Sequence, residues 1–105
     1  LLVQMTLTTI TLNEGLETIG GLSFASAQLT HISLPNSVTY IDGWAFSHLV
    51  LTELKLPEKI EYIGTEAFYN SQLTTIEFPD TLEEIRSGAF YNSNFKELTL
   101  PENLT

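Results

Sequence analysis

The 105-residue sequence contains no cysteine, few basic residues and no long apolar run. The absence of cysteine excludes disulfide bonds and thiolate metal sites. No apolar stretch approaches the roughly 20 residues of a transmembrane helix, so we expect no membrane insertion in this segment. Four basic residues against 13 acidic residues give a formal net charge of -9. This charge repels phosphate groups, and we therefore expect neither nucleic acid nor an anionic membrane surface as a partner.

What the chain does contain is a pattern that recurs every 22 residues. Residues 1–6 fit the end of a preceding copy, and the last copy breaks off at Thr105. Because both ends fall inside a repeat, we expect residues 1–105 to form one repeat domain within a longer array. In the numbering used below, position 1 is the first residue of each copy. The copies, repeats 1 to 5, begin at Leu7, Leu29, Leu51, Leu73 and Phe95.

Seven positions of each copy are apolar or small. Positions 4 and 6 have the same parity, so a short strand through positions 3 to 6 points them inward and leaves positions 3 and 5 outside. Proline at position 7 ends this strand. The Ile-Gly pair at positions 13 and 14 predicts a turn, and Ala-Phe at positions 17 and 18 predicts one short helical or 3₁₀ turn. In repeat 3 the seven residues are Leu51, Leu54, Leu56, Ile60, Ile63, Ala67 and Phe68.

A single copy buries too little apolar surface to offset the ordering of its backbone. Stacking removes this deficit, because each repeat covers the apolar face of its neighbour and equivalent positions become columns. The predicted parallel strands pass near Ile10, Ile32, Leu54, Ile76 and Leu98.

The pattern LxxIxLPxxLxxIGxxAFxxS resembles the BspA-like leucine-rich repeats, also called the Treponema pallidum type. The resemblance covers the whole chain. It implies a curved solenoid with a parallel β-sheet on its concave face, secreted or displayed on the cell surface and used in adhesion and protein contacts. We expect a right-handed leucine-rich-repeat solenoid of about five 22-residue repeats with little helix. Asp42 and Arg86 replace glycine at position 14, which argues against a uniform turn there, and no asparagine ladder occupies position 9.

The sequence predicts no catalytic, cofactor or metal site. His31 and His48 occupy positions 3 and 20, on different faces, so they cannot jointly bind a metal. His31 lies one repeat from Glu53, a pair that could bind a cation or tune a proton, but two unlike ligands make no closed site and an exposed polar pair is favoured. Ser33 lies one repeat from Lys55, but this solvated pair lacks the oxyanion hole that catalysis needs. Acidic residues recur at positions 8 and 11, where a cation ladder, a basic partner and a solvated edge all remain open.

Two surfaces are candidates for binding a protein. A parallel sheet presents positions 3 and 5 as a preorganised array, which lowers the entropic cost of binding. This predicted protein-binding surface comprises His31, Glu53, Lys55, Thr75 and Glu77. The competing aromatic surface comprises Tyr40 and Tyr62 at position 12 and Tyr69 and Tyr91 at position 19, with Trp44 standing alone at position 16.

The repeat pattern without catalytic residues predicts a non-catalytic protein-binding or adhesion module. The family resemblance places it at the cell surface or in the secreted fraction. The alternative is a structural spacer or a self-assembling solenoid that associates end to end. An enzyme would need a further domain.

Overall fold

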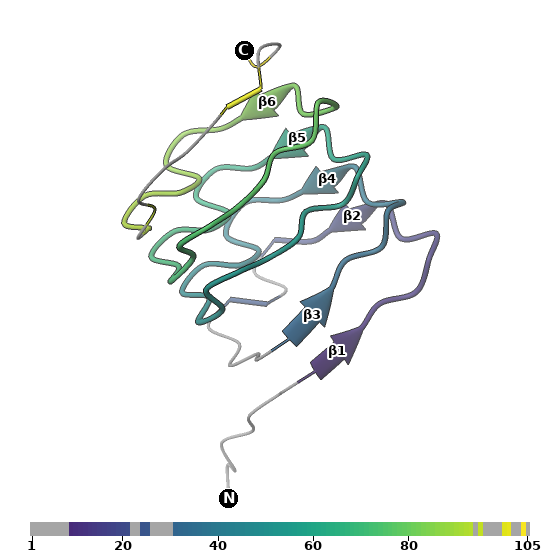
Figure 1. Cartoon of the computed structure of the whole chain (residues 1–105), viewed down its shortest axis with the longest axis horizontal. Coiled ribbons are helices and arrows are strands. Elements are labelled where there is room, and N and C mark those ends of the chain that lie inside the picture. The colour runs from purple at the N-terminus through teal and green to yellow at the C-terminus, as the bar shows by residue number, and fades with distance from the viewer. Residues whose placement is uncertain are drawn as a thin grey trace, which may run out of the picture.

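A computed structural model describes residues 9–21, 24–25, 31–93, 95, 100–101 and 104, and for residues 9–11 and 31 it describes the backbone alone. Within this part of the chain each repeat forms one layer of a stack, and the layers follow one another in sequence order (Figure 1). The described residues form no helix. This agrees with the sequence prediction of little helix.

The predicted strand at positions 3 to 6 is present in the first two repeats. Strand β1 (Thr9–Thr11) pairs in parallel with β3 (His31–Ser33), so that Ile10 lies opposite Ile32 as predicted. In repeats 3 and 4 the same positions are joined by one isolated parallel bridge, between Glu53 and Thr75. The strand predicted near Leu98 lies outside the described residues.

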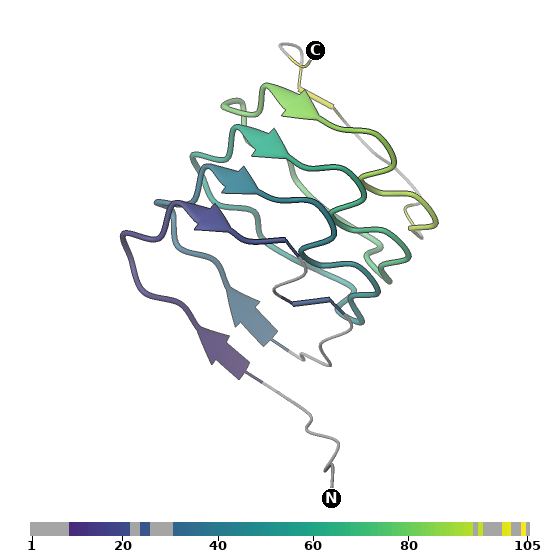
Figure 2. The ribbon, with the colours of Figure 1, turned by 180° about the vertical axis from the view of Figure 1, so that it is seen from behind.

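A longer parallel sheet occupies positions 12 and 13. It contains β2 (Thr18–Ile19), β4 (Tyr40–Ile41), β5 (Tyr62–Ile63) and β6 (Glu84–Ile85), in the order β2-β4-β5-β6. These four strands lie one above another in both views (Figures 1 and 2). The prediction of a turn beginning at position 13 was therefore wrong.

The backbone at position 14 explains this difference. Its N–H donates to the carbonyl of position 13 in the preceding repeat, so the pairing continues past the isoleucine. A backbone bond does not depend on the side chain, and the replacements Asp42 and Arg86 therefore make the same bond as Gly64. The three bonds join Asp42 to Ile19 at 2.9 Å, Gly64 to Ile41 at 2.7 Å and Arg86 to Ile63 at 2.9 Å.

Positions 14 to 21 form a series of hydrogen-bonded turns, where the sequence predicted one short helical or 3₁₀ turn at positions 17 and 18. The N–H groups of positions 17, 19 and 21 bond three residues back within the same repeat, whereas those of positions 16, 18 and 20 bond to the next repeat. This alternation prevents a continuous helix, because every second N–H is already used between layers. In repeat 3 the inter-repeat bonds are Glu66 to Ser87 at 3.0 Å, Phe68 to Ala89 at 2.7 Å and Asn70 to Tyr91 at 2.8 Å.

In repeats 2 to 4 the turns force a left-handed backbone at two positions of each repeat. A turn closed by a three-residue-back bond and positive φ at its third residue is typical of type II geometry. Positions 16 and 20 are these third residues. Positive φ values are found at Trp44, Glu66 and Gly88 at position 16, and at His48, Asn70 and Asn92 at position 20.

The core consists of the predicted apolar columns. Phe46 and Phe68 are fully buried, and their rings stack with centroids 5.3 Å apart. Phe24 and Phe90 extend this stack at either end and are only partly buried. Burial is most complete in repeats 2 and 3, which have a described repeat on both sides. The predicted division into inward and outward positions is confirmed there.

Hydroxyl groups take over part of the role of the missing asparagine ladder at position 9. The Ser37 hydroxyl donates to the carbonyl of Leu16 at 2.7 Å and accepts from the N–H of Gly15. The Thr81 hydroxyl donates to the carbonyl of Ile60, also at 2.7 Å. These bonds tie adjacent repeats together at the turn that follows the proline.

Candidate functional site

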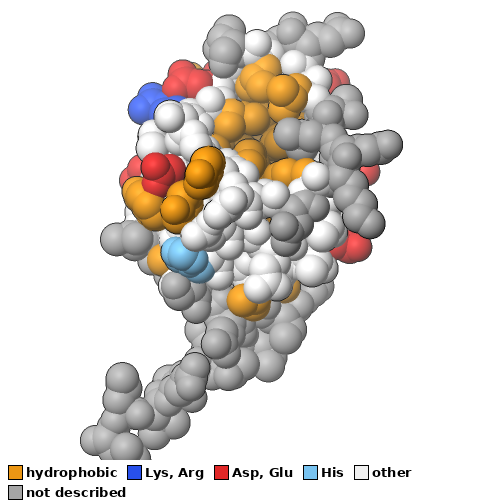
Figure 3. All heavy atoms as spheres, turned by 90° about the vertical axis from the view of Figure 1, so that its left-hand side faces the viewer, with side chains coloured by type: hydrophobic (Ala, Val, Ile, Leu, Met, Phe, Trp, Pro, Cys, Tyr) orange, Lys and Arg blue, Asp and Glu red, His pale blue; other side chains and the backbone are white. Residues whose placement is uncertain are grey.

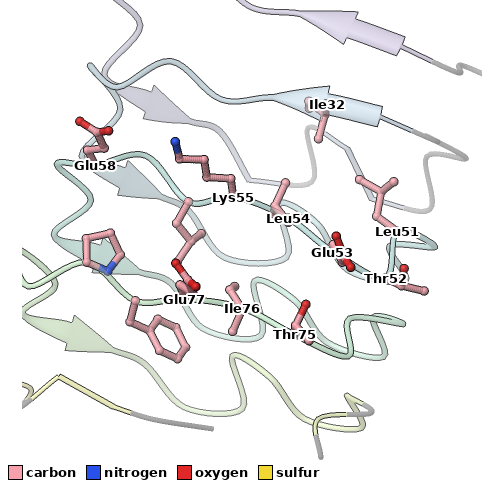
Figure 4. Close-up of a pocket in the computed structure, with 13 residues that line it drawn as sticks. Ile32, Leu51, Thr52, Glu53, Leu54, Lys55, Glu58, Thr75, Ile76 and Glu77 are labelled. Atoms are coloured by element: carbon pink, nitrogen blue, oxygen red, sulfur yellow. The ribbon is translucent and has the colours of Figure 1, made fainter. Parts of the chain in front are cut away.

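A hollow lies over positions 1 to 8 of repeat 3 and positions 3 to 7 of repeat 4. It is a groove of about 710 Å³, and it also reaches Ile32 in β3 (Figure 4). Its floor is apolar and its walls are polar. The lining residues are Ile32, Leu51, Thr52, Glu53, Leu54, Lys55, Leu56, Glu58, Thr75, Ile76, Glu77, Phe78 and Pro79.

Four of the five residues predicted to bind a protein line this groove. Glu53, Lys55, Thr75 and Glu77 are all exposed, and the bridge between Glu53 and Thr75 places position 3 of the two repeats side by side. The backbone of His31 belongs to β3, but its side chain lies outside the described part of the structure. The pairing of His31 with Glu53 thus stays a prediction.

The floor of the groove is formed by the inward positions of the same strands. Leu54 and Leu56 are buried, whereas Ile76 and Phe78 are only partly buried and offer apolar surface to a ligand. Apolar surface at the base of a cleft, with a few polar groups around it, is the usual composition of a binding site.

The charge of the groove is predominantly negative. Glu53, Glu58 and Glu77 supply three carboxylates, and Lys55 supplies the one cationic side chain of the lining. Within the described residues the only ion pair is that of Arg86 with Glu84, at 2.6 Å and away from the groove. Lys55 is therefore not held by a carboxylate in the described part of the chain.

A second, smaller hollow lies beside the groove. It measures about 370 Å³ and is lined by parts of repeats 1 and 2 together with Lys55 and Leu56. Ile32, Lys55 and Leu56 line both hollows. Lys55 therefore stands between the two, and its side chain extends from repeat 3 toward repeat 2 (Figure 4). Sequence reasoning missed this second hollow, because regular stacking would leave no space at that point.

The structure divides the predicted tyrosine surface into two separate pairs. Tyr40 and Tyr62 lie on β4 and β5, with ring centroids 5.9 Å apart. The Tyr62 phenol donates a hydrogen bond to Glu83, and this bond, aided by the charge of that carboxylate, raises the pKa of Tyr62. Tyr69 and Tyr91 stack at 5.5 Å on the turns of repeats 3 and 4.

Trp44 does not stand alone, contrary to the sequence prediction. Its ring lies 5.3 Å from that of Tyr69, and the imidazole of His48 meets Tyr69 edge-on at 5.8 Å. Trp44, His48, Tyr69 and Tyr91 thus form an aromatic cluster on the turns. Figure 3 shows hydrophobic side chains at the surface of this side, next to a histidine and acidic groups. The sequence analysis missed this cluster because it did not recognise that positions 16, 19 and 20 lie in the two overlapping turns at positions 16–19 and 18–21, which brings their side chains to the same part of the surface.

The acidic columns do not assemble a metal site in the part of the chain that is described. No group of three or more histidine, aspartate or glutamate side chains capable of holding an ion occurs there. In the position 8 column, the Asn36 side chain accepts a hydrogen bond from the N–H of Glu58 at 3.2 Å. An amide in this column thus links two repeats and interrupts the run of carboxylates.

Comparison with known families assigns the fold to a class. Residues 3–105 match the BspA type leucine rich repeat region, in six copies. The chain belongs to this family of leucine-rich-repeat proteins. The six copies are one more than the five repeat starts found by inspection. A comparison with curated proteins gave no match.

Family membership defines the general role of the chain. Leucine-rich repeats of this kind are repeat modules for protein interaction, and as a class they are non-catalytic scaffolds. None of the described residues belongs to a helix long and apolar enough to cross a membrane.

Proposed function

We propose that this chain is the protein-binding module of a cell-surface or secreted adhesion protein and that the groove over repeats 3 and 4 is its contact surface. The observation that supports this most directly is a coincidence of two independent results. Outward positions chosen from the repeat pattern, Glu53, Lys55, Thr75 and Glu77, line one groove of the described structure. The family to which the chain belongs supports the surface location.

The groove combines features that favour a protein partner. Its apolar floor supplies area for burial, and its exposed charged groups select among partners by electrostatic complementarity. The surrounding strands are anchored by the stacked core, so little backbone freedom is lost when a ligand binds.

In the test, the intact chain is first used to capture a partner from a mixture of extracellular proteins. The affinity of this partner for the parent chain and for variants is then measured. Lys55→Ala combined with Glu77→Ala should weaken its binding about tenfold or more, a loss of about 1.4 kcal/mol, at an unchanged urea midpoint. The matched control is Lys59→Ala with Glu61→Ala, which removes the same two charge types outside the groove.

Three outcomes contradict the proposal. Failure to capture any protein removes the assigned activity. Equal weakening by the control pair indicates a general charge effect. A larger loss from Tyr69→Ala with Tyr91→Ala than from the groove variant moves the contact surface to the aromatic cluster.

A further inference from the structure

The backbone pairing between repeats is interrupted at the groove. β3 pairs with β1 on one edge, but among the described residues no bridge joins its other edge to residues 53–55 of repeat 3. On the other side of the same repeats, β4 and β5 are paired in register, with Tyr40 opposite Tyr62. Repeats 2 and 3 are therefore joined at positions 12 and 13 and open at positions 3 to 5.

The interruption coincides with the two hollows. Ile32 of β3 lines both of them, as do Lys55 and Leu56 of repeat 3. Figure 4 shows the labelled Ile32 on its strand and Leu54 and Lys55 on the neighbouring stretch of repeat 3, all three among the residues that line the groove. The open edge of β3 therefore faces space that is accessible to a ligand.

An open strand edge presents backbone N–H and C=O groups that another extended chain can pair with. Such pairing supplies affinity that is independent of side chains. Specificity then comes from alternate side chains of the added strand, which point to opposite faces.

The side chains around this edge select the composition of an added strand. One face of it would meet the apolar side of the groove, where Ile32 and Leu54 are buried and Ile76 is partly exposed. The other would meet the rim, where Glu53, Glu58 and Glu77 outnumber Lys55, on a chain with a net charge of -9. Charge complementarity thus favours a basic occupant with apolar residues at every second position.

We propose that the groove binds an extended, basic segment of the partner protein, with alternating apolar and basic residues, which adds as a strand to the open edge of β3. The inference rests on the proposed function and specifies the partner's chemistry. It differs from a general charged contact because it requires backbone hydrogen bonds from the ligand.

The probe is a short synthetic peptide of alternating valine and lysine, added to the intact chain and followed by fluorescence anisotropy. Three companion peptides separate the contribution of charge from that of backbone hydrogen bonds. The first replaces lysine with glutamate. The other two carry N-methyl groups on the backbone amides of alternate residues, one peptide for each of the two possible phases. We expect the parent peptide to bind, the glutamate peptide not to bind, and one N-methylated phase to lose about tenfold or more in affinity.

Variants of the protein locate the site. Glu53→Gln with Glu77→Gln should weaken the parent peptide about tenfold. The matched control is Glu17→Gln with Glu61→Gln, which removes two charges at position 11 and should leave binding nearly unchanged. The N–H groups of the neighbours Ile32 and Ser33 point to opposite edges of β3, so amide exchange should slow at one of the two residues and change little at the other when the peptide is bound.

Each of the following results overturns the inference. If both N-methylated peptides bind as tightly as the parent peptide, no strand is added. Equal weakening by the two glutamine pairs shows attraction to the overall charge. If the peptide fails while Lys55→Ala with Glu77→Ala still weakens a captured protein, strand addition is wrong and the proposed function stands. If the variants weaken the binding of neither the peptide nor a captured protein, both the inference and the proposed function are wrong.

Discussion

The two sides of each repeat differ in how tightly neighbouring layers are joined. At positions 12 to 14 the sheet β2-β4-β5-β6 is continuous, and each repeat donates backbone hydrogen bonds to the one before it. Among the described residues, pairing at positions 3 to 6 stops after β3 and returns as one bridge between Glu53 and Thr75. Both sides have regular apolar positions, so the apolar pattern alone does not cause the difference.

Close backbone approach distinguishes the continuous side. A Cβ atom added to Gly64 would lie 2.6 Å from the nitrogen of Gly43 in the preceding repeat. Layers at this point are therefore in direct backbone contact, and the stacked phenylalanines follow on the adjacent turns. The comparison teaches that one side of the repeat maintains the stack, which leaves the other side free to open into a groove.

The largest expected effect is that of shortening the phenylalanine stack. Phe68→Ala should destabilise the protein by about 3 to 5 kcal/mol, because it leaves a cavity between Phe46 and Phe90. Thr75→Ala in the groove should change stability by at most about 0.5 kcal/mol. Urea denaturation measures both. Equal losses would break the comparison, since they would mean that the groove side supports the stack as strongly.

A smaller loss is expected from filling the closest approach between layers. Gly64→Ala should cost about 1 to 3 kcal/mol, since its methyl group meets backbone atoms that cannot rotate away. Gly15→Ala is the contrasting case, because no atom lies within 4 Å and only its φ of +101° is unfavourable. We expect about 1 kcal/mol there. A Gly64→Ala midpoint no lower than that of Gly15→Ala would contradict the close contact of layers.

The left-handed turns allow a finer test of the same side. Asn70 has a φ of 55° and accepts a hydrogen bond from the Asn92 side chain at 2.8 Å. Asn70→Ala and Asn70→Gly both remove this bond, but only glycine adopts positive φ without strain. Alanine should therefore be less stable than glycine by about 1 kcal/mol. Similar midpoints for the two variants would show that the amide pair, and not the backbone, decides stability at this turn.

The smallest effect concerns the titration of Tyr62. Its pKa is raised above the ordinary 10.0 by the hydrogen bond to Glu83 and by that carboxylate's charge. The folded state thus favours the neutral phenol, and this stabilisation is complete below about pH 10. It is lost as the pH rises through the higher folded pKa. Ultraviolet titration of Glu83→Gln should show one tyrosine ionising at lower pH than in the parent, and an unchanged curve would exclude this contact.

Much of the stack could be predicted because its cause is local and repeated. Isoleucine at position 13 and phenylalanine at position 18 are buried in the central repeats as the spacing indicates. The outward placement of Glu53, Lys55, Thr75 and Glu77 follows from strand parity in the same way. The sequence pattern wrongly left Trp44 without an aromatic neighbour. Grouping residues into columns relates the same position in successive repeats, so it overlooks contacts between different positions, such as that of Trp44 with Tyr69.

The sequence by itself determined the period, the buried columns and the outward residues of the candidate site, since the 22-residue spacing repeats the same side-chain chemistry in register. Only the tertiary structure decided where the backbone pairs. Hydrogen bonds between layers use N–H and C=O groups that every non-proline residue has, and the residue letters therefore do not distinguish a paired edge from an open one. The turn expected at positions 13 and 14 became part of a sheet for this reason. The open edge of β3, and the groove beside it, likewise arise from how neighbouring repeats meet.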